Sequence, residues 1–259
     1  MGGAAQPATP AARDFSAACL FAGELLALLR VVQRHRGLCA GPGGVPEPGP
    51  ARAAAVNVGR ALARCQKTSA SLPPCRQEQA FLATLAADWR ALRDHWPRLL
   101  PEQVFLRHTR LIGELLRQVE KLAQHWPGVD QRGHSLTTYA CHLPALAEAL
   151  GQIRALGCAI AAEGGCPLLK RTRLLYLCSE VQAHLGAALQ GQGEGAPPIE
   201  ARVARTAAEG LVHRVRAEFL QDRVAYPVAE FYRGATEAID AVFTWIELMA
   251  AVWMEGVPE

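Results

Sequence analysis

An arginine lies on an otherwise apolar helix face near the start of the chain. The apolar residues of this face fall within about a third of a helical wheel; they are Phe21, Leu25, Leu28, Leu29, Val32 and Cys39. Arg36 falls in the same stripe, whereas Arg30 and Arg34 point to the opposite side. A guanidinium on a buried face is costly to desolvate and needs an anionic or acceptor partner. Either a buried glutamate or carbonyl supplies that partner, or a bound anion does. Our hypothesis is the bound anion.

A second arginine borders an apolar stripe in the other half of the chain. The stripe consists of Leu143, Leu146, Leu150, Ile153, Gly157 and Ile160. Arg154 lies at its edge, near the small residues Cys158 and Ala161. Small neighbours leave space beside the guanidinium for another helix or for a ligand, and an interhelical salt bridge is an equal alternative. A guanidinium offers parallel N–H donors in one plane, which suits a planar anion.

Signals for catalysis or for metal binding are lacking in the sequence. It contains no GxSxG, HExxH, GxxxxGK[ST] or GxGxxG motif. The eight cysteines form no CxxC pair and no Cys/His cluster with zinc spacing, so we expect free thiols, no metal and no cofactor. The eight histidines are scattered, and we expect them at the surface or at helix ends. A histidine phosphotransfer role for His35 fails, because Arg36 and Gly37 follow it at once instead of three to four positions later. We therefore predict no enzyme and no catalytic residue.

Composition narrows the class of protein. Half of the 259 residues are hydrophobic and only 6% are aromatic, which favours an ordered, helical chain. The net charge of +3, without a basic cluster, argues against direct binding of nucleic acid. The N-terminus lacks a charged segment followed by an apolar run, and no segment reaches about 18 consecutive uncharged apolar residues. We expect a cytoplasmic protein without a membrane segment.

Periodicity predicts an all-α protein of eight amphipathic helices. We place the helices at 13–40, 51–70, 75–95, 102–126, 135–163, 167–189, 199–223 and 228–254. Gly- and Pro-rich segments at 41–50 and 191–198 separate helices, and a polar stretch divides the halves near residue 130. The predicted organisation is a disordered tail at 1–12, a first four-helix bundle at 13–130 and a second at 131–259.

Three segments resemble the nitrate- and nitrite-sensing (NIT) domain family. VVQRHRGLCA, with Arg36, Gly37 and Leu38, resembles the family's N-terminal motif, a leucine-rich helix that ends in Arg-Gly, an apolar residue and a small polar one. ALAEALGQIRALGCAI resembles the Leu-Arg-x-Leu-Gly helix, and EFYRGATEAIDAVFTWIELM resembles the closing helix. The three segments occur in the family's order and span most of the chain.

The resemblance implies a double four-helix bundle that binds nitrate or nitrite through arginines of both halves. It assigns this role first to Arg36, with the adjacent Gly37, and then to Arg154. Arg60 and Arg64, one turn apart, are further candidate donors, although we favour surface charge for them. Two arginines on one anion repel each other until it binds, so binding would draw the helices together.

The resemblance also bears on partners. NIT domains usually lie beside an RNA-binding antiterminator domain, a histidine kinase or a chemoreceptor signalling region. The chain ends at Glu259 without such a module, so the expected recipient of the signal is a separate protein or a homodimer partner. The alternative function is a helical scaffold or adaptor without a small-molecule ligand.

Overall fold

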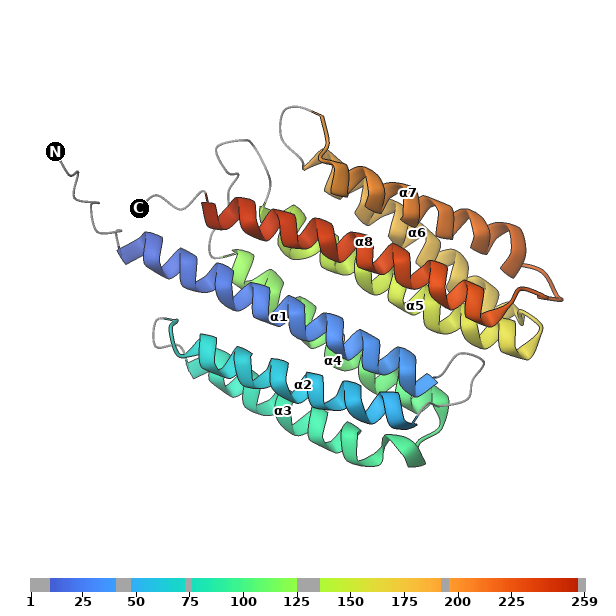
Figure 1. The fold of residues 1–259 in the computed structure, drawn as a ribbon, viewed down its shortest axis with the longest axis horizontal. Helices are drawn as coiled ribbons and strands as arrows, with labels where there is room; N and C mark the ends of the chain where they lie inside the picture. Colours follow the sequence, from blue (N-terminus) through green and yellow to red (C-terminus); the bar gives the residue numbers. More distant parts are fainter. Residues whose placement is uncertain (1–9, 41–47, 73–75, 125–135, 192–195, 256–259) are drawn as a thin grey trace.

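The structure is a computed structural model that describes residues 10–40, 48–72, 76–124, 136–191 and 196–255. These residues form eight α-helices (Figure 1), and the predicted all-α fold is confirmed. The helices are α1 (Pro10–Ala40), α2 (Pro48–Ser69), α3 (Arg76–His95), α4 (Pro101–Gln124), α5 (Leu143–Glu163), α6 (Leu168–Gln190), α7 (Ile199–Arg214) and α8 (Val228–Glu255). A 3₁₀ turn at Trp96–Arg98 joins α3 to α4, and π-helical turns at Thr138–His142 and Val215–Phe219 precede α5 and follow α7.

The helices pack in two groups that follow the chain order. In the first group α1 contacts α2 and α4, and α3 contacts the same two helices. In the second group α5 contacts α6 and α8, and α7 also packs on α8. The groups meet where α1 lies against α5 and α8, and where α4 touches α5 (Figure 1). The predicted boundary near residue 130 lies outside the described residues.

The predicted apolar stripes form the core, with one exception. In α4 and α8 the apolar residues at helical spacing predict the inward faces, and they are buried; they are Val104, Leu111, Leu115, Val119, Leu122, Phe231, Ala235, Ala238, Val242, Trp245 and Met249. In α7 a row of apolar residues spaced four apart predicts the inward face; it consists of Ile199, Val203, Ala207, Leu211, Val215 and Phe219. Ile199 and Val203 are 61% and 53% exposed, whereas Leu211, Val215 and Phe219 are buried. A strict spacing of four residues rotates by roughly 40° at each step around a helix of 3.6 residues per turn. The row of residues therefore begins on the exposed side of α7 and reaches the buried face only at Leu211.

Several helix boundaries differ from the predicted ones. Helix α1 begins at Pro10, three residues before its predicted start, and the rest of the predicted tail, 1–9, is not described. Helix α2 begins at Pro48, because a proline in the first turn forfeits no intrahelical hydrogen bond. The α-helical part of α7 ends at Arg214 and not near residue 223.

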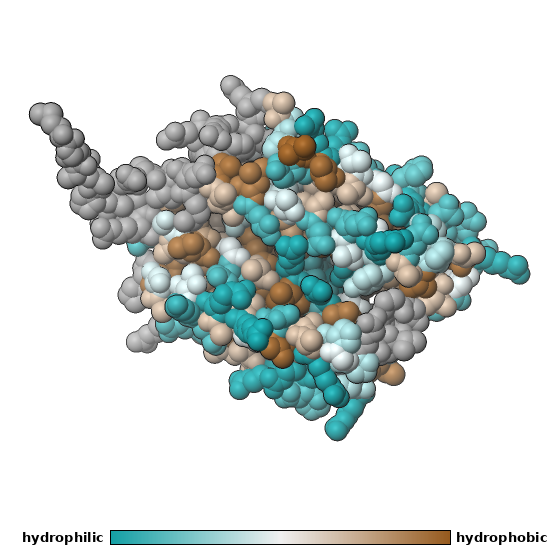
Figure 2. All heavy atoms as spheres, viewed as in Figure 1, coloured by the Kyte–Doolittle hydropathy of each residue, from teal (hydrophilic) through white to brown (hydrophobic). Residues whose placement is uncertain are grey.

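Two segments, Asp14–Cys39 and Thr138–Glu163, are apolar and long enough to cross a membrane by composition alone. Core helices of soluble proteins pass the same test. These segments largely coincide with α1 and α5, and each of these two helices has neighbours in both groups, as α4 and α8 also do. A helix packed on several sides needs few polar faces, which accounts for their composition. On the face shown in Figure 2, hydrophobic patches alternate with hydrophilic ones.

Candidate functional site

The Arg36 guanidinium forms a buried ion pair across the two groups of helices. Its side chain is 1% exposed, and its Nη1 and Nη2 donate to the two carboxylate oxygens of Glu148 on α5 at 2.7 and 3.0 Å. Nη1 also donates to Thr109 Oγ1 on α4 at 3.0 Å. The burial of Arg36 predicted from the helical wheel is confirmed. Of the partners that the sequence left open, the structure shows the glutamate.

The Glu148 carboxylate is held by neutral donors as well. Gln33 Nε2 donates to it at 2.8 Å and Gln152 Nε2 at 3.0 Å. Gly151 makes room for this network, because a Cβ atom there would lie 2.8 Å from Arg36 Nη2. The charge of Arg36 is thus balanced within the protein.

Arg154 is bound differently. It is 5% exposed; Nη1 donates to Thr236 Oγ1 on α8 at 3.0 Å, and Nη2 donates to the backbone carbonyl of Gln33 on α1 at 3.2 Å. The guanidinium carbon lies 5.1 Å from the centre of the Tyr232 ring. Its Nε has no hydrogen-bond partner, and no described carboxylate accepts a hydrogen bond from Arg154. Burial lowers the pKa of Arg154, and the nearby charge of Arg36 lowers it further.

Two glycines explain how Arg154 fits among the helices. A Cβ atom on Gly37 would lie 3.1 Å from Arg154 Nη2, so the glycine lets the guanidinium lie against α1. Gly37 therefore belongs to the site, as a residue that provides space. Beside Gly157 the space is filled by the Phe231 ring of α8, 2.1 Å from the position of a Cβ atom. At Gly157 the small residue admits another helix.

A cavity of about 370 Å³ opens beside Arg154, between α1, α5 and α8. We call it the interhelical cavity; it is lined by Arg30, Gln33, Arg34, Arg154, Tyr232, Thr236, Ile239 and Asp240. A water molecule takes about 30 Å³ in the liquid, so the space admits a small anion together with water. Three arginines and one aspartate line the cavity, which gives it an excess of positive charge.

The remaining two arginines of the cavity, on α1, differ in their partners. Arg30 pairs with Asp240 and with Glu247 of α8, each at 2.9 Å. Arg34 is exposed, and within the described part of the chain it makes no hydrogen bond or ion pair. Sequence reasoning placed both arginines opposite Arg36 and gave them no role. The sequence signal for these two arginines is their i,i+4 spacing, which places them on one face of α1, and α8 packs against α1.

The other sequence candidates lie elsewhere. Arg60 and Arg64 are exposed on α2, and Arg64 Nε pairs with Glu24 Oε2 at 2.8 Å. Neither lines the interhelical cavity. Their positions agree with surface charge, which the sequence favoured.

The solved structure of the NasR transcription antiterminator superposes with a TM-score of 0.74 and 18% sequence identity. The match covers 95% of this chain and 70% of that one. The two proteins share a fold. No protein-family model and no curated protein sequence matches this chain.

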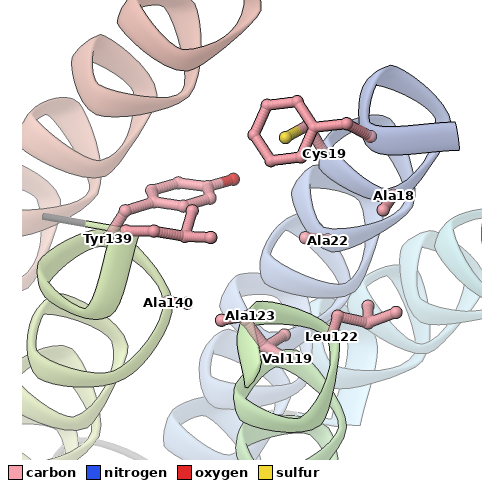
Figure 3. Close-up of a pocket in the computed structure, with 10 residues that line it drawn as sticks. Ala18, Cys19, Ala22, Val119, Leu122, Ala123, Tyr139 and Ala140 are labelled. Atoms are coloured by element: carbon pink, nitrogen blue, oxygen red, sulfur yellow. The ribbon is translucent and has the colours of Figure 1, made fainter. Parts of the chain in front are cut away.

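A small apolar hollow near the start of α1 is a weaker candidate (Figure 3). Its volume is about 20 Å³, close to the space of a single water. It is lined by Phe15, Ala18, Cys19, Ala22, Val119, Leu122, Ala123, Leu136, Tyr139 and Ala140. The Tyr139 hydroxyl is buried without a partner among the described residues. This hollow has too little room for a ligand larger than water.

Two histidines lie in the core, contrary to prediction. His35 on α1 and His108 on α4 are both 0% exposed, so the expectation that all histidines lie at the surface or at helix ends is wrong for this pair. Burial of His35 also removes the phosphotransfer alternative, which needs an accessible ring. His35 and Cys39 are one turn apart, and this i,i+4 spacing was the visible part of the signal. His108 comes from a distant helix, which local spacing does not reveal.

Proposed function

We propose that the protein senses a small planar oxyanion, nitrate or nitrite, which binds in the interhelical cavity beside Arg154. One observation carries the proposal: a buried guanidinium that borders a cavity has no carboxylate partner among the described residues, and its Nε–H makes no hydrogen bond. A buried charge is costly unless it is paired, and an anion in the cavity would pair it. Arg34, which has no described partner, would supply a second cation from α1.

The chemistry of the lining residues suits a monovalent anion. A guanidinium donates parallel N–H groups to planar oxygens. Tyr232 adds a hydroxyl group from α8, whereas the Thr236 hydroxyl accepts from Arg154 and donates to the Tyr232 carbonyl; Asp240 reduces the total positive charge. When Glu247, which pairs with Arg30, is counted with the three arginines and Asp240, the local charge is +1, which one monovalent anion neutralises.

The proposal separates the roles of the two arginines. Arg36 holds α1 against α5 through Glu148, whereas Arg154 meets the anion. Gln33 connects them, because its side chain donates to Glu148 and its backbone carbonyl accepts from Arg154. Anion binding at Arg154 would therefore alter the contact between the two groups of helices.

Two further lines of support come from comparison. The resemblance to the NIT family implies nitrate or nitrite as the ligand. The structural neighbour is a transcription antiterminator, which favours a regulatory protein over an enzyme. A signal passed to a separate protein or to a second copy of the chain is part of the proposal.

The scaffold alternative rests on a specific observation too. Arg36 ends in a salt bridge to Glu148, as a purely structural arginine would. Arg154 does not, and it borders a polar cavity. This difference favours the sensor.

Isothermal titration calorimetry with nitrate and nitrite tests the proposal, with chloride and sulfate as control anions. We compare the wild type with Arg154→Met and Arg34→Met, and use Arg60→Met, outside the cavity, as the matched control. A lost charge-assisted hydrogen bond costs about 1.5–3 kcal/mol, so each cavity variant should bind at least about tenfold more weakly. Arg60→Met should bind like the wild type. The absence of binding to the folded wild type, or unchanged affinity in both cavity variants, would refute the site.

A further inference from the structure

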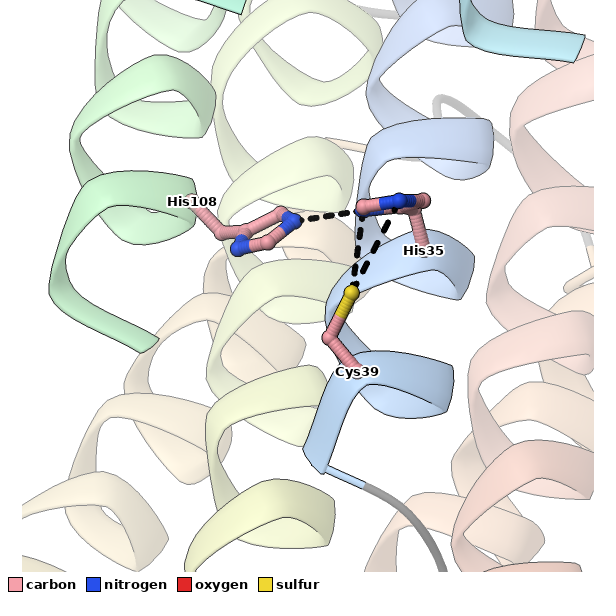
Figure 4. Close-up of side chains that lie close together, drawn as sticks. All are labelled: His35, Cys39 and His108. Atoms are coloured by element: carbon pink, nitrogen blue, oxygen red, sulfur yellow. Dashed lines mark hydrogen bonds between the residues drawn. The ribbon is translucent and has the colours of Figure 1, made fainter. Parts of the chain in front are cut away.

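We propose that His35, Cys39 and His108 form a binding site for one soft monovalent metal ion, Cu(I), inside the first group of helices. The three side chains point toward one another from α1 and α4 (Figure 4). His35 Nδ1 lies 2.7 Å from His108 Nε2, and Cys39 Sγ lies 3.4 Å from His35 Nδ1. All three candidate ligand atoms are within 4.8 Å of one another.

The orientation of His108 is that of a metal ligand. Its Nδ1 lies 2.7 Å from the backbone carbonyl of Val104, so Nδ1 carries the hydrogen and donates it. Nε2 then presents a lone pair toward His35. Histidines that bind metals usually donate their other N–H to a carbonyl or carboxylate in this way. Without metal, His35 Nδ1–H donates to His108 Nε2.

The surroundings favour the neutral ligand forms. The three residues are at most 4% exposed, and the Trp89 and Trp96 rings pack edge-on against His35. Burial lowers the pKa of His35 to about 4 and that of His108 to about 3, so both rings are neutral near pH 7. Neutral imidazole is the form that binds metals.

Binding requires a small rearrangement and the release of one proton. Burial raises the pKa of the Cys39 thiol to about 12, so the metal must displace its proton. The S–H bond breaks, the sulfur–metal bond forms, and the proton leaves to solvent. The proton on His35 Nδ1 moves to Nε2 of the same ring, which keeps that ring neutral. Around a trigonal ion with bonds of ~2.0 Å, the two nitrogens would be roughly 3.5 Å apart, so the rings must separate by less than about 1 Å.

Charge and ligand number select the ion. A thiolate and a monovalent cation sum to zero charge, which a dry site tolerates, whereas a divalent cation would leave one uncompensated positive charge. Arg36 is close enough for its charge to lower the pKa of His108, so an additional positive charge would be repelled. Structural zinc usually takes four protein ligands, and the described residues gather three here. Thiolate and imidazole ligands suit Cu(I).

Anaerobic competition with the Cu(I) chelator bicinchoninate tests the site on the full chain. We compare the wild type with Cys39→Ala and His108→Gln, and circular dichroism confirms that each variant is folded. The matched control is Cys178→Ala, because Cys178 is equally buried on α6, outside this cluster. The wild type and Cys178→Ala should hold one equivalent of Cu(I), and Cys39→Ala should bind it at least about 100-fold more weakly. X-ray absorption on the one-equivalent complex should show one sulfur and two nitrogen ligands.

Other results would overturn the proposal. Equal Cu(I) retention by the wild type and a folded Cys39→Ala protein would place the metal elsewhere. A complex with two or more sulfur ligands would assign binding to other cysteines of the eight in the chain. Tighter binding of Zn(II) than of Cu(I) would contradict the charge argument. None of these readouts involves nitrate, so this site and the oxyanion site stand or fall separately.

Discussion

Removal of the Glu148 carboxylate is the sharpest test of how the two groups of helices are joined. In Glu148→Ala, Arg36 loses both of its carboxylate bonds and keeps only Thr109 as a described acceptor. Arg36 is 1% exposed, so water cannot replace the lost partner without local opening. Breaking a buried ion pair on one side costs about 3–5 kcal/mol. We expect a loss of this size in the free energy of unfolding.

Urea denaturation followed by circular dichroism measures this loss. Two further variants show whether the loss of stability comes from the buried ion pair. Glu209→Ala breaks an ion pair with Arg205 whose side chains are more than half exposed, and it should cost less than about 1 kcal/mol. The double variant Arg36→Met with Glu148→Leu removes both charges, so it should recover at least about 2 kcal/mol of the loss. If Glu148→Ala costs no more than Glu209→Ala, or if the double variant is no more stable than the single one, the buried pair does not hold the helices as argued.

Two more predictions concern packing and pH. Gly157→Ala should lower the free energy of unfolding by about 1–3 kcal/mol, because its Cβ would overlap the Phe231 ring. Gly186→Ala, whose Cβ meets no atom in α6, should raise the free energy of unfolding by up to about 1 kcal/mol. Equal effects of the two substitutions in urea denaturation would refute the packing argument. The buried His108 has a pKa lowered from 6.5 to about 3, so the unfolded chain binds its proton first and stability should fall as the pH drops from about 6.5 toward 3. Urea denaturation at pH 7, 6, 5 and 4 measures this fall. It should be smaller in His108→Gln than in His213→Gln, a variant of an exposed histidine. If the free energy of unfolding changes equally with pH in both variants, the His108 ring is not buried in its neutral form.

The number and approximate positions of the helices could be predicted from local sequence. Helix period and proline or glycine breaks placed all eight helices, since these signals act over a few residues. The burial of Arg36 followed in the same way, from its position in an apolar stripe. Its partner Glu148 did not, because 112 residues separate the two and no local rule fixes which helix packs opposite.

The cavity and the buried histidine pair were missed from sequence for a common physical reason. A single apolar stripe predicts one buried face for each helix, as in a surface helix. Helix α1 contacts neighbours in both groups, so its second face also lies against helices and places Arg30 and Arg34 at the interhelical cavity. Likewise, His35 was expected at the surface or at a helix end, although α4 brings His108 against it.

The position of α1 also explains how one site could control the whole molecule. Arg36 ties α1 to α4 and α5, and Arg154 ties α5 to α8 and to the α1 backbone at Gln33. All bonds that these two guanidiniums make therefore lie at the junction of four helices. An anion at Arg154 would compete for donors now given to Thr236 and Gln33, whereas the Arg36 pair would stay intact. Binding would then shift α8 relative to α1 while α1 and α5 remained joined, which is a defined motion for a partner to detect.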